Sequence, residues 1–366
     1  MIRIAIIGAG VIGATIAYEL SLIKGLKITL IDKEVSTMGS TRAALGVAMG
    51  ILSTKMKGRG WKLRHTSLQR YKTLIPELET LTKQSIPINH QGILMLKFTE
   101  KQIRQWKELI TIRKSQGYNL EIWDKETLHK KCPQIENNTI IGAVYSPQDL
   151  QLNPLKLTQA LVKGASINGV SCKFGVKVKN IISNTLNNSN IRKCYEIETT
   201  QGKLEVDGLV IAAGLGSNSL TITSSRPLDI RPVLGQALQV KLDKLPENQN
   251  FQPVINGNDV NIVPLGNREY WIGATVEFPK RTEEIILESE LLENMKQQAL
   301  SFCPFLQNAK VIKTWYGERP RPEGEPAPII RKLPGYDNVL VATGHYRNGI
   351  LLAPATALAI REYWFS

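Results

Sequence analysis

The stretch that most constrains this chain is the glycine-rich hexapeptide from Gly8 to Gly13, which reads Gly-Ala-Gly-Val-Ile-Gly. A short apolar and β-branched run, 2–7, precedes it, and residues 11–23 follow with helical apolar spacing and no proline. The hexapeptide is therefore predicted to turn a buried strand into a helix. In such a turn Gly8 permits the tight bend, Gly10 lets the backbone approach a pyrophosphate, and Gly13 lets the helix pack on the strand.

An acidic residue completes this pattern. Residues 27–31 are predicted to form a second strand, and Asp32 ends it roughly twenty residues after the turn, which is the spacing of the dinucleotide fingerprint. A carboxylate at this place can accept hydrogen bonds from a ribose diol. The glycines alone would fit any tightly packed βαβ unit, but strand, turn, helix, strand and terminal acid together predict a nucleotide site.

Length and composition favour a two-domain protein of the cytoplasm. The chain has 366 residues, more than one hydrophobic core usually serves, and 42% of them are hydrophobic. Arg3 precedes an apolar run, but glycines and Glu19 interrupt that run and no cleavage pattern follows, so we expect no secretory signal. The late apolar run, 349–360, is too short to cross a bilayer and contains Pro354. We therefore expect a cytoplasmic location and no membrane contact.

The charge and the cysteines exclude two further classes of site. The formal net charge is +14, but Lys and Arg are spread along the chain without a basic tail or aromatic interleaving, so we expect no nucleic-acid partner. The four cysteines are far apart, with no Cys-x-x-Cys pair, which indicates reduced structural thiols and no metal site. They are Cys132, Cys172, Cys194 and Cys303.

Beyond residue 150 the pattern predicts strands again. A cap and a proline at Asn153-Pro154 begin a helix that is predicted to run to about residue 168. Material for the parallel sheet is then expected to return in four strands, 170–174, 176–182, 195–199 and 203–212. An antiparallel sheet is expected from 231–242, 260–264 and 270–275, followed by helices in 283–303 and a return strand at 311–319.

Two apolar strands each end in a small residue and a glycine, at Gly214 and at Gly344. A nicotinamide cofactor would explain the first glycine turn but not these two ends. FAD is longer, lies across a parallel sheet, and needs several separated stretches of bare backbone. After Gly344 the chain turns from strand into helix over 345–351, which leaves backbone N–H groups free to face a flavin carbonyl.

At this point the sequence resembles the D-amino-acid-oxidase-like FAD amine oxidases and, within them, the glycine oxidases of the thiamine pathway. The resemblance covers nearly the whole chain, and the run from Gly344 to Pro354 is its most specific part. The other matching motifs are Gly8 to Gly13, Thr37 to Thr41, Val233 to Gln236, Ile262 to Pro264, Gly273 to Thr275 and Trp315 to Pro320.

The resemblance implies where the ligands bind. The implied cofactor contacts, together with Gly8, Gly10, Gly13 and Gly214, are Val11, Ile12, Asp32, Lys33, Ser40, Thr41, Leu45, Gly46, Val47, Val178, His345, Tyr346, Arg347, Asn348, Gly349, Ile350 and Leu351. The substrate carboxylate would be bound by Arg347, with Arg319 nearby. Such arginines suit this role without the family as well, because a guanidinium binds a carboxylate through two parallel hydrogen bonds.

The implied reaction is hydride transfer from the α-carbon of an amine to the flavin, with O2 as the final acceptor. Since the protein mainly orients the substrate, no catalytic acid or base is expected, and His345 is expected to pack beside the cofactor. Two positions depart from the glycine oxidase pattern: Asn261 stands where a tyrosine is common, and Val276 follows Gly-Ala-Thr. Asn261 could still donate to the carboxylate, and the extra room would suit sarcosine or a small D-amino acid.

The sequence therefore predicts an α/β fold, with a Rossmann-like FAD-binding domain of the glutathione-reductase type and an interleaved α+β substrate domain with an antiparallel sheet. The first domain is expected to comprise residues 1–88, 146–226 and 319–366, and the second 89–145 and 227–318. The resemblance also implies a non-covalent FAD, because the return strand 311–319 contains no cysteine where the similar sarcosine oxidases carry their flavin link.

Alternatives and partners remain open at this stage. The alternatives are a D-amino acid or sarcosine oxidase, a dehydrogenase of the same fold that passes electrons to another acceptor, and an RNA-bound flavoprotein suggested only by the charge. Besides the amino acid and O2, the partners left open are a second copy of the chain and a thiazole synthase.

Overall fold

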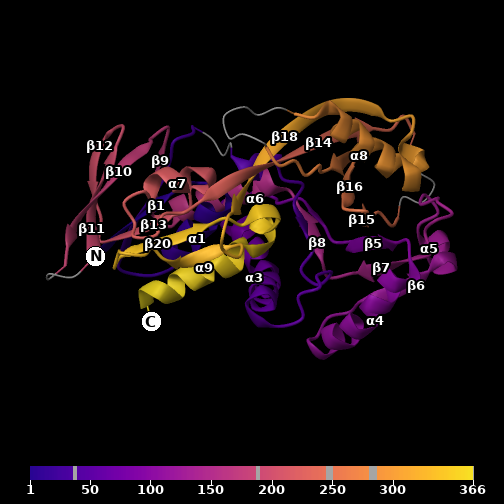
Figure 1. Cartoon of the computed structure of the whole chain (residues 1–366), viewed down its shortest axis with the longest axis horizontal. Coiled ribbons are helices and arrows are strands. Elements are labelled where there is room, and N and C mark those ends of the chain that lie inside the picture. The colour runs from indigo at the N-terminus through magenta and orange to yellow at the C-terminus, as the bar shows by residue number, and fades with distance from the viewer. Residues whose placement is uncertain (36–38, 187–189, 245–249, 280–286, 366) are drawn as a thin grey trace.

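The computed structural model describes residues 1–35, 39–186, 190–244, 250–279 and 287–365. Two large sheets lie at the two ends of an elongated molecule (Figure 1). The six-stranded sheet has helices α1 (Val11–Ser21) and α9 (Gly349–Phe365) beside it, and the eight-stranded sheet carries the helices α4 (Glu100–Ser115), α5 (Lys125–Lys131) and α8 (Ser289–Phe302).

The six-stranded sheet is parallel except at one edge, where β19 runs antiparallel to β20. Strand β1 is central: it pairs with β2 over its whole length and with β13 over Ile4–Ile7, as its apolar β-branched sequence predicts. One face packs on α1, α9, α3 (Gly58–Thr82) and α6 (Pro154–Ile167) through the largest core cluster. In spatial order the strands are β19 (Ile329–Lys332), β20 (Val339–Thr343), β13 (Gly208–Ile211), β1 (Ile2–Ile7), β2 (Leu26–Asp32) and β9 (Ser171–Phe174).

The other face of this sheet is covered by a separate three-stranded antiparallel sheet, made of β10 (Val178–Thr185), β11 (Arg192–Thr199) and β12 (Gly202–Glu205). The expectation that all strands of 170–212 belong to the parallel sheet is therefore wrong for these three. The expected strand at 203–212 is two strands, because the chain changes sheet at Asp207. There the Asp207 N–H donates to the Arg3 carbonyl, and Arg3 donates to the Asp207 carboxylate.

The eight-stranded sheet is antiparallel except where β15 runs parallel to β5. Its longest pairing joins β14 to β18 over the whole length of β14. The strands, in spatial order, are β18 (Lys310–Pro322), β14 (Ile230–Lys241), β17 (Glu269–Gly273), β16 (Val260–Gly266), β15 (Val254–Gly257), β5 (Ile93–Lys97), β7 (Gly142–Ser146) and β6 (Glu121–Asp124). The expected helical region 283–303 is α8 followed by a 3-10 turn, η2 (Pro304–Leu306), and its first residues lie outside the described ones.

Short elements connect the two large sheets. A small sheet of β3 (Val47–Ala48), β8 (Leu150–Leu152) and β4 (Ile88–Asn89) lies between them. One core cluster contains residues from both sides, among them Leu45, Leu68, Val144, Ala237 and Leu351. Within the described ranges no helix is long and apolar enough to cross a membrane.

Candidate functional site

The glycine turn after β1 has the geometry that its sequence predicts. Gly8 has a φ of +103°, which favours glycine, and a Cβ on it would lie 2.5 Å from the Ala212 carbonyl oxygen. A Cβ on Gly13 would lie 1.8 Å from the Gly8 oxygen, so α1 packs directly on the turn. At Gly10 the nearest atom to such a Cβ is the Thr41 Oγ1 at 3.3 Å. Gly10 is therefore the place in this turn where a ligand can approach the backbone.

Two side chains fix the turn from either side. Asp32, at the end of β2, accepts a hydrogen bond from the Ala9 N–H at 2.6 Å and one from the Glu34 N–H at 2.9 Å. Thr41, in the short helix α2 (Ser40–Ala43), accepts from the Val11 N–H at 3.1 Å. The N-cap residue of α1 is Gly10, which has no side chain to cap the helix, so the positive end of α1 can face an anion such as a pyrophosphate beside the Thr41 hydroxyl.

The ends of β13 and β20 lie beside the turn, as the repeated Ala-x-Gly pattern predicts. Gly214 begins the 3-10 turn η1 (Gly214–Gly216) with a φ of +56°, and Gly344 has a φ of +67°. The Thr343 hydroxyl links the two ends, because it donates to the Gly214 carbonyl at 3.3 Å. The short helix α7 (Ser217–Leu220) follows, and its Ser217 hydroxyl lies 3.1 Å from that of Thr343.

After Gly344 the chain forms the 3-10 turn η3 (Tyr346–Asn348) and then enters α9 at Gly349. Tyr346 has a φ of +52°, which is unusual for a residue with a side chain. His345 is buried, and its Nε2 lies 2.9 Å from the Thr356 Oγ1. Burial, and then the nearby Arg59, lower the pKa of His345 to about 3. The imidazole is therefore neutral and held by the protein.

Arg319 lies on β18, partly buried against β14. Its Nη1 donates to the Leu234 carbonyl at 2.7 Å, and a Cβ on Gly235 would lie only 2.1 Å from its Nη2. Burial lowers the pKa of Arg319, and the positive charge of Arg347 lowers it further. The two guanidinium groups thus lie close enough to repel each other, and an anion between them would relieve that repulsion.

Arg347 comes from η3, which contacts β18. Its Nη2 lies 3.8 Å from the Asp259 Oδ1, in an ion pair that joins η3 to the turn between β15 and β16. The Arg347 side chain is 37% exposed, so it borders on solvent, whereas Arg319 lies deeper. The site therefore has an outer and an inner arginine.

Asn261 lies on β16 and is buried. Its Nδ2 donates to the Gly273 carbonyl at 3.3 Å, and its Oδ1 accepts from the Asn256 Nδ2 at 3.0 Å. One amide hydrogen of Asn261 thus remains for a ligand, and the proposed role of Asn261 stays a prediction.

Similarity to known proteins agrees with this geometry. The family described as "DAO: FAD dependent oxidoreductase" matches residues 3–363. The chain belongs to this family. A glycine oxidase from Bacillus subtilis is 28% identical over 359 residues, which cover 98% of this chain and 91% of that protein. The crystal structure of a glycine oxidase from Bacillus cereus superposes with a TM-score of 0.85 at 26% identity, covering 99% of this chain and 96% of that one.

A third relative is longer. The "Bifunctional protein ThiO/ThiG" of Trichormus variabilis is 29% identical over 369 residues, which cover 98% of this chain but 52% of that protein. The chain therefore spans about half the length of such two-part relatives. The fold is that of the FAD dependent oxidoreductases, with a Rossmann-like nucleotide-binding sheet and an interleaved antiparallel sheet.

The remaining residues of the predicted cofactor site lie on several separate elements. Ser40 donates to the Glu318 carbonyl and so connects α2 to β18. Gly46 has a φ of +75° and lies between Leu45 and Val47, the first residue of β3. Lys33 is exposed and pairs with Glu34, and Val178 is buried at the start of β10, on the far face of the parallel sheet. Thr37 and Met38, from one matching motif, lie outside the described residues.

Sequence reasoning missed four residues at the arginine end of the site. Gly235 belongs to a matching motif, but its role as the seat of the Arg319 guanidinium is visible only in the fold. Glu277 is buried, accepts from the Gln236 Nε2 at 3.1 Å, and favours the charged form of Arg319. Asn256 and Asp259 belong to a hairpin whose position relative to Arg347 no local pattern reveals.

A buried carboxylate holds the loop that follows β3. The Asp149 oxygens accept hydrogen bonds from the N–H groups of Gly50, Ile51 and Leu52 at 2.7, 2.9 and 2.8 Å. Arg113 donates from its Nε to the Ile51 carbonyl at 3.0 Å. A Cβ on Gly50 would lie 3.4 Å from the Leu351 Cδ1, so this loop packs on α9 just after η3.

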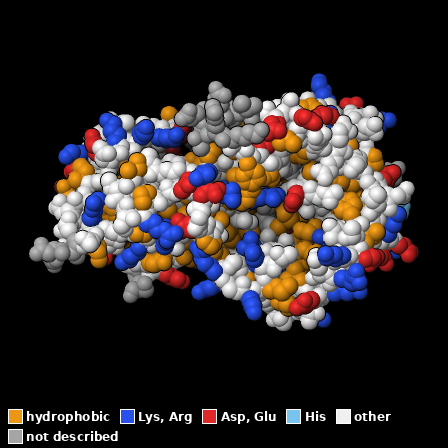
Figure 2. Space-filling view, viewed as in Figure 1, with side chains coloured by type: hydrophobic (Ala, Val, Ile, Leu, Met, Phe, Trp, Pro, Cys, Tyr) orange, Lys and Arg blue, Asp and Glu red, His pale blue; other side chains and the backbone are white. Residues whose placement is uncertain are grey.

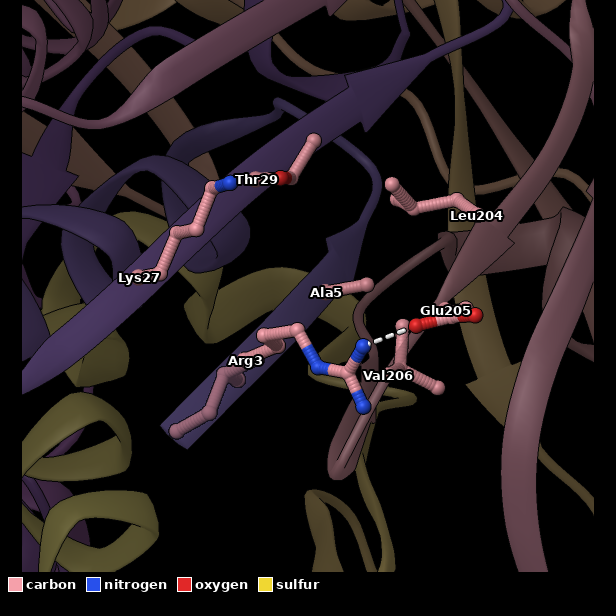
Figure 3. A pocket seen from close by; sticks show the side chains of 8 residues that line it. Arg3, Ala5, Lys27, Thr29, Leu204, Glu205 and Val206 are labelled. Atoms are coloured by element: carbon pink, nitrogen blue, oxygen red, sulfur yellow. Dashed lines mark hydrogen bonds and ion pairs between the residues drawn. The ribbon is translucent and has the colours of Figure 1, made fainter. Parts of the chain in front are cut away.

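Other features lie away from this site or are spread over the molecule. A cavity of about 50 Å³ is lined by Arg3, Lys27 and Glu205. It lies at the amino-terminal ends of β1 and β2, opposite the end of the sheet that carries the glycine turn (Figure 3). Ligands of such sheets bind at the carboxyl ends of the strands, and Arg3 there is paired with Glu205 and Asp207. On the face seen in Figure 2, Lys and Arg are scattered and form no continuous stripe. Within the described part of the chain no cluster of three or more His, Cys, Asp or Glu could hold a metal ion.

Proposed function

We propose that this FAD dependent oxidoreductase oxidises glycine or another small amine: glycine, O2 and water give glyoxylate, ammonia and H2O2. The alternative is a D-amino acid or sarcosine as the preferred substrate, because Asn261 replaces a larger residue. The glycine oxidases among its relatives support the substrate class, and the two arginines support recognition of an α-carboxylate.

The observation that carries the proposal is the convergence of Arg319 and Arg347 beside the ends of β13 and β20. Arg319 is fixed by its bond to the Leu234 carbonyl and by contact with Gly235, so its orientation is set before a substrate arrives. A carboxylate held between the two guanidinium groups has its α-carbon in a defined direction. FAD, when bound, accepts a hydride from that carbon and is reoxidised by O2.

The residues around the glycine turn fit the cofactor. We infer that Gly10, Val11 and Ile12 would hold its pyrophosphate at the N-terminus of α1, and that Asp32 would accept from the ribose hydroxyls. The segment 345–351 would hold the flavin ring. Attachment would be non-covalent, since β18 has no cysteine. His345 is neutral and bonded to Thr356, so it positions the backbone and is not proposed as an acid or base.

The two large sheets support a division of the chain into two domains. We propose that residues 1–88, 146–226 and 319–366 form the FAD-binding domain and that 89–145 and 227–318 form the substrate domain. The longer relatives named ThiO/ThiG support a further proposal, that the product passes to a thiazole synthase partner in thiamine synthesis. The cytoplasm is the proposed location, where the four cysteines would stay reduced.

A substrate panel tests the activity. The FAD-loaded protein is given glycine, sarcosine, D-alanine and D-proline, and both peroxide and oxo acid are measured. We expect peroxide with at least one of them. Reduction of an artificial dye without peroxide would assign the protein to the dehydrogenases of this fold, and no turnover of any amine would reject the proposal.

Arginine variants test the carboxylate site. Arg347→Ala and Arg319→Ala are each expected to lower kcat/KM by about 10- to 150-fold, since a hydrogen bond to a charged group contributes about 1.5–3 kcal/mol. The affinity for FAD should change much less. Arg231→Ala is the matched control, because Arg231 is exposed and paired with Asp229. Equal losses of substrate and FAD binding would assign Arg347 to the cofactor.

A further inference from the structure

The turn between β15 and β16 presents one carboxylate in a fixed place. Gly257 pairs with Val260, which leaves Asn258 and Asp259 as the two central residues of the turn. Their φ angles are +48° and +68°, as in the tight hairpin turns that require two left-handed residues. Asn256 and Asn261 hold the hairpin together just below through their amide hydrogen bond. Asp259 thus extends from a well-defined turn and not from a long loop.

The Asp259 carboxylate reaches the outer arginine of the site. Its Oδ1 lies 3.8 Å from the Arg347 Nη2, too far for a two-pronged hydrogen-bonded pair. The Asp259 side chain is 83% exposed, and exposed ion pairs of this kind are weak. Arg347 therefore keeps its donors for a substrate, while Asp259 stays beside it as a negative charge at the entrance.

The charges around the two arginines are already nearly balanced. Asp259 faces Arg347, and the buried Glu277 acts on Arg319. One substrate carboxylate would be the third anion beside two cations, and the ammonium group of the amine offsets it. A second carboxylate on the same substrate would have no cation left, and Asp259 would repel it at the mouth of the site.

We propose that Asp259 is a specificity-determining residue that selects against amines with a second negative group. The inference rests on the proposed function, since it concerns the same carboxylate site. It names the substrate class more closely: small amino acids with one carboxylate are accepted, and dicarboxylic amines are disfavoured.

Turnover of two matched amines tests this selection. Iminodiacetate carries a carboxymethyl group on the nitrogen of glycine, and N-ethylglycine carries a smaller, neutral ethyl group at the same place. Asp259→Asn should raise the kcat/KM ratio of iminodiacetate to N-ethylglycine about fivefold, and Asp259→Lys should raise it further, since one charge and then two are changed a few Å away. Asparagine also adopts left-handed φ angles, so Asp259→Asn keeps the turn.

The control is Asp337→Asn, which removes an exposed acid paired with Lys332 at the edge of the other sheet. It changes the net charge equally and should leave the ratio unchanged. Raising the ionic strength should shrink the wild-type discrimination, because the charges at the entrance are exposed to salt.

A binding measurement separates this inference from the proposed activity. The dissociation constants of acetate and malonate are measured from the change that each causes in the visible spectrum of the FAD-loaded protein. The wild type should prefer acetate more strongly than Asp259→Asn and Asp259→Lys do. If no amine is oxidised, the proposed function fails while this comparison still tests Asp259. The inference would be overturned if the kcat/KM ratio of the two amines were the same in the wild type and both variants. It would also be overturned if the ratio of the dissociation constants of acetate and malonate were the same in all three proteins.

Discussion

At the residue scale, His345 shows how a polar side chain in the segment proposed to hold the flavin is kept uncharged by burial. Its ring is almost completely buried, and the Nε2 lies 2.9 Å from the Thr356 Oγ1, about two turns into α9. Burial lowers the pKa to about 3, so the ring stays uncharged under any assay condition near neutrality. The histidine therefore contributes packing and one hydrogen bond between η3 and α9.

The burial of His345 makes the free energy of unfolding depend on pH. The unfolded chain binds a proton at this histidine below about pH 6.5, while the folded chain does so only near pH 3. Between these values the unfolded state binds more protons, so this residue makes the folded state less stable as the pH falls. His345→Gln should have a lower free energy of unfolding than the wild type at pH 7. At pH 5 this difference between the two proteins should be smaller by about 2 kcal/mol.

Urea unfolding at both pH values, followed by tryptophan fluorescence, measures that difference. His90→Gln serves as the control, because His90 is exposed on the surface. This control shows how replacing a surface histidine alters the unfolding data at the two pH values. A difference between His345→Gln and the wild type that is the same at both pH values would mean that this ring takes up a proton as readily in the folded protein as in the unfolded chain.

At the scale of the element, β14 and β18 act as one unit that aims Arg319. The strands pair along their length, Gly235 lies opposite Gly317, and the Arg319 guanidinium rests on Gly235. Gly235→Ala should displace the guanidinium, because the new Cβ would lie 2.1 Å from Nη2. We expect kcat/KM for the amine to fall about 10- to 100-fold, as misplacement of a positioning group by about 1 Å does.

A double variant shows whether Gly235→Ala lowers kcat/KM by displacing Arg319. If it does, Gly235→Ala combined with Arg319→Ala should be no worse than Arg319→Ala alone. Losses that add up in the double variant would mean that Gly235→Ala disturbs the sheet itself. FAD affinity is measured in parallel and should stay near the wild-type value.

The same elements show what the sequence could and could not predict. The turn from Gly8 to Gly13, Asp32 and the ends at Gly214 and Gly344 were predictable, because each depends on neighbours in the chain or on the register of parallel strands. The pairing of β10 to β12 was not, since alternating apolar residues fit a covering antiparallel sheet as well as a central parallel one. Asp259 was not predictable as a partner of Arg347 because only the assembled fold brings the hairpin to η3.

At the scale of the whole molecule, the predicted cofactor site and the core draw on the same distant parts of the chain. The glycine turn comes from the beginning, Gly214 from the middle, and η3 from near the end. The core cluster with Leu45, Val144 and Leu351 also joins a strand of the eight-stranded sheet to α9, a helix that packs on the six-stranded sheet. The two sheets should therefore unfold together, with FAD acting on both.

Titration of the FAD-free protein with FAD tests this coupling by calorimetry. At about 100 times its dissociation constant, FAD should add about 2.7 kcal/mol to the free energy of unfolding, which for a chain of this size raises Tm by about 3–4 °C. One transition should move as a whole, because a core cluster joins the helices α3 and α9, which pack on the six-stranded sheet, to strands of the eight-stranded sheet. Two transitions, of which FAD shifts only one, would show that the antiparallel sheet unfolds independently of the cofactor site.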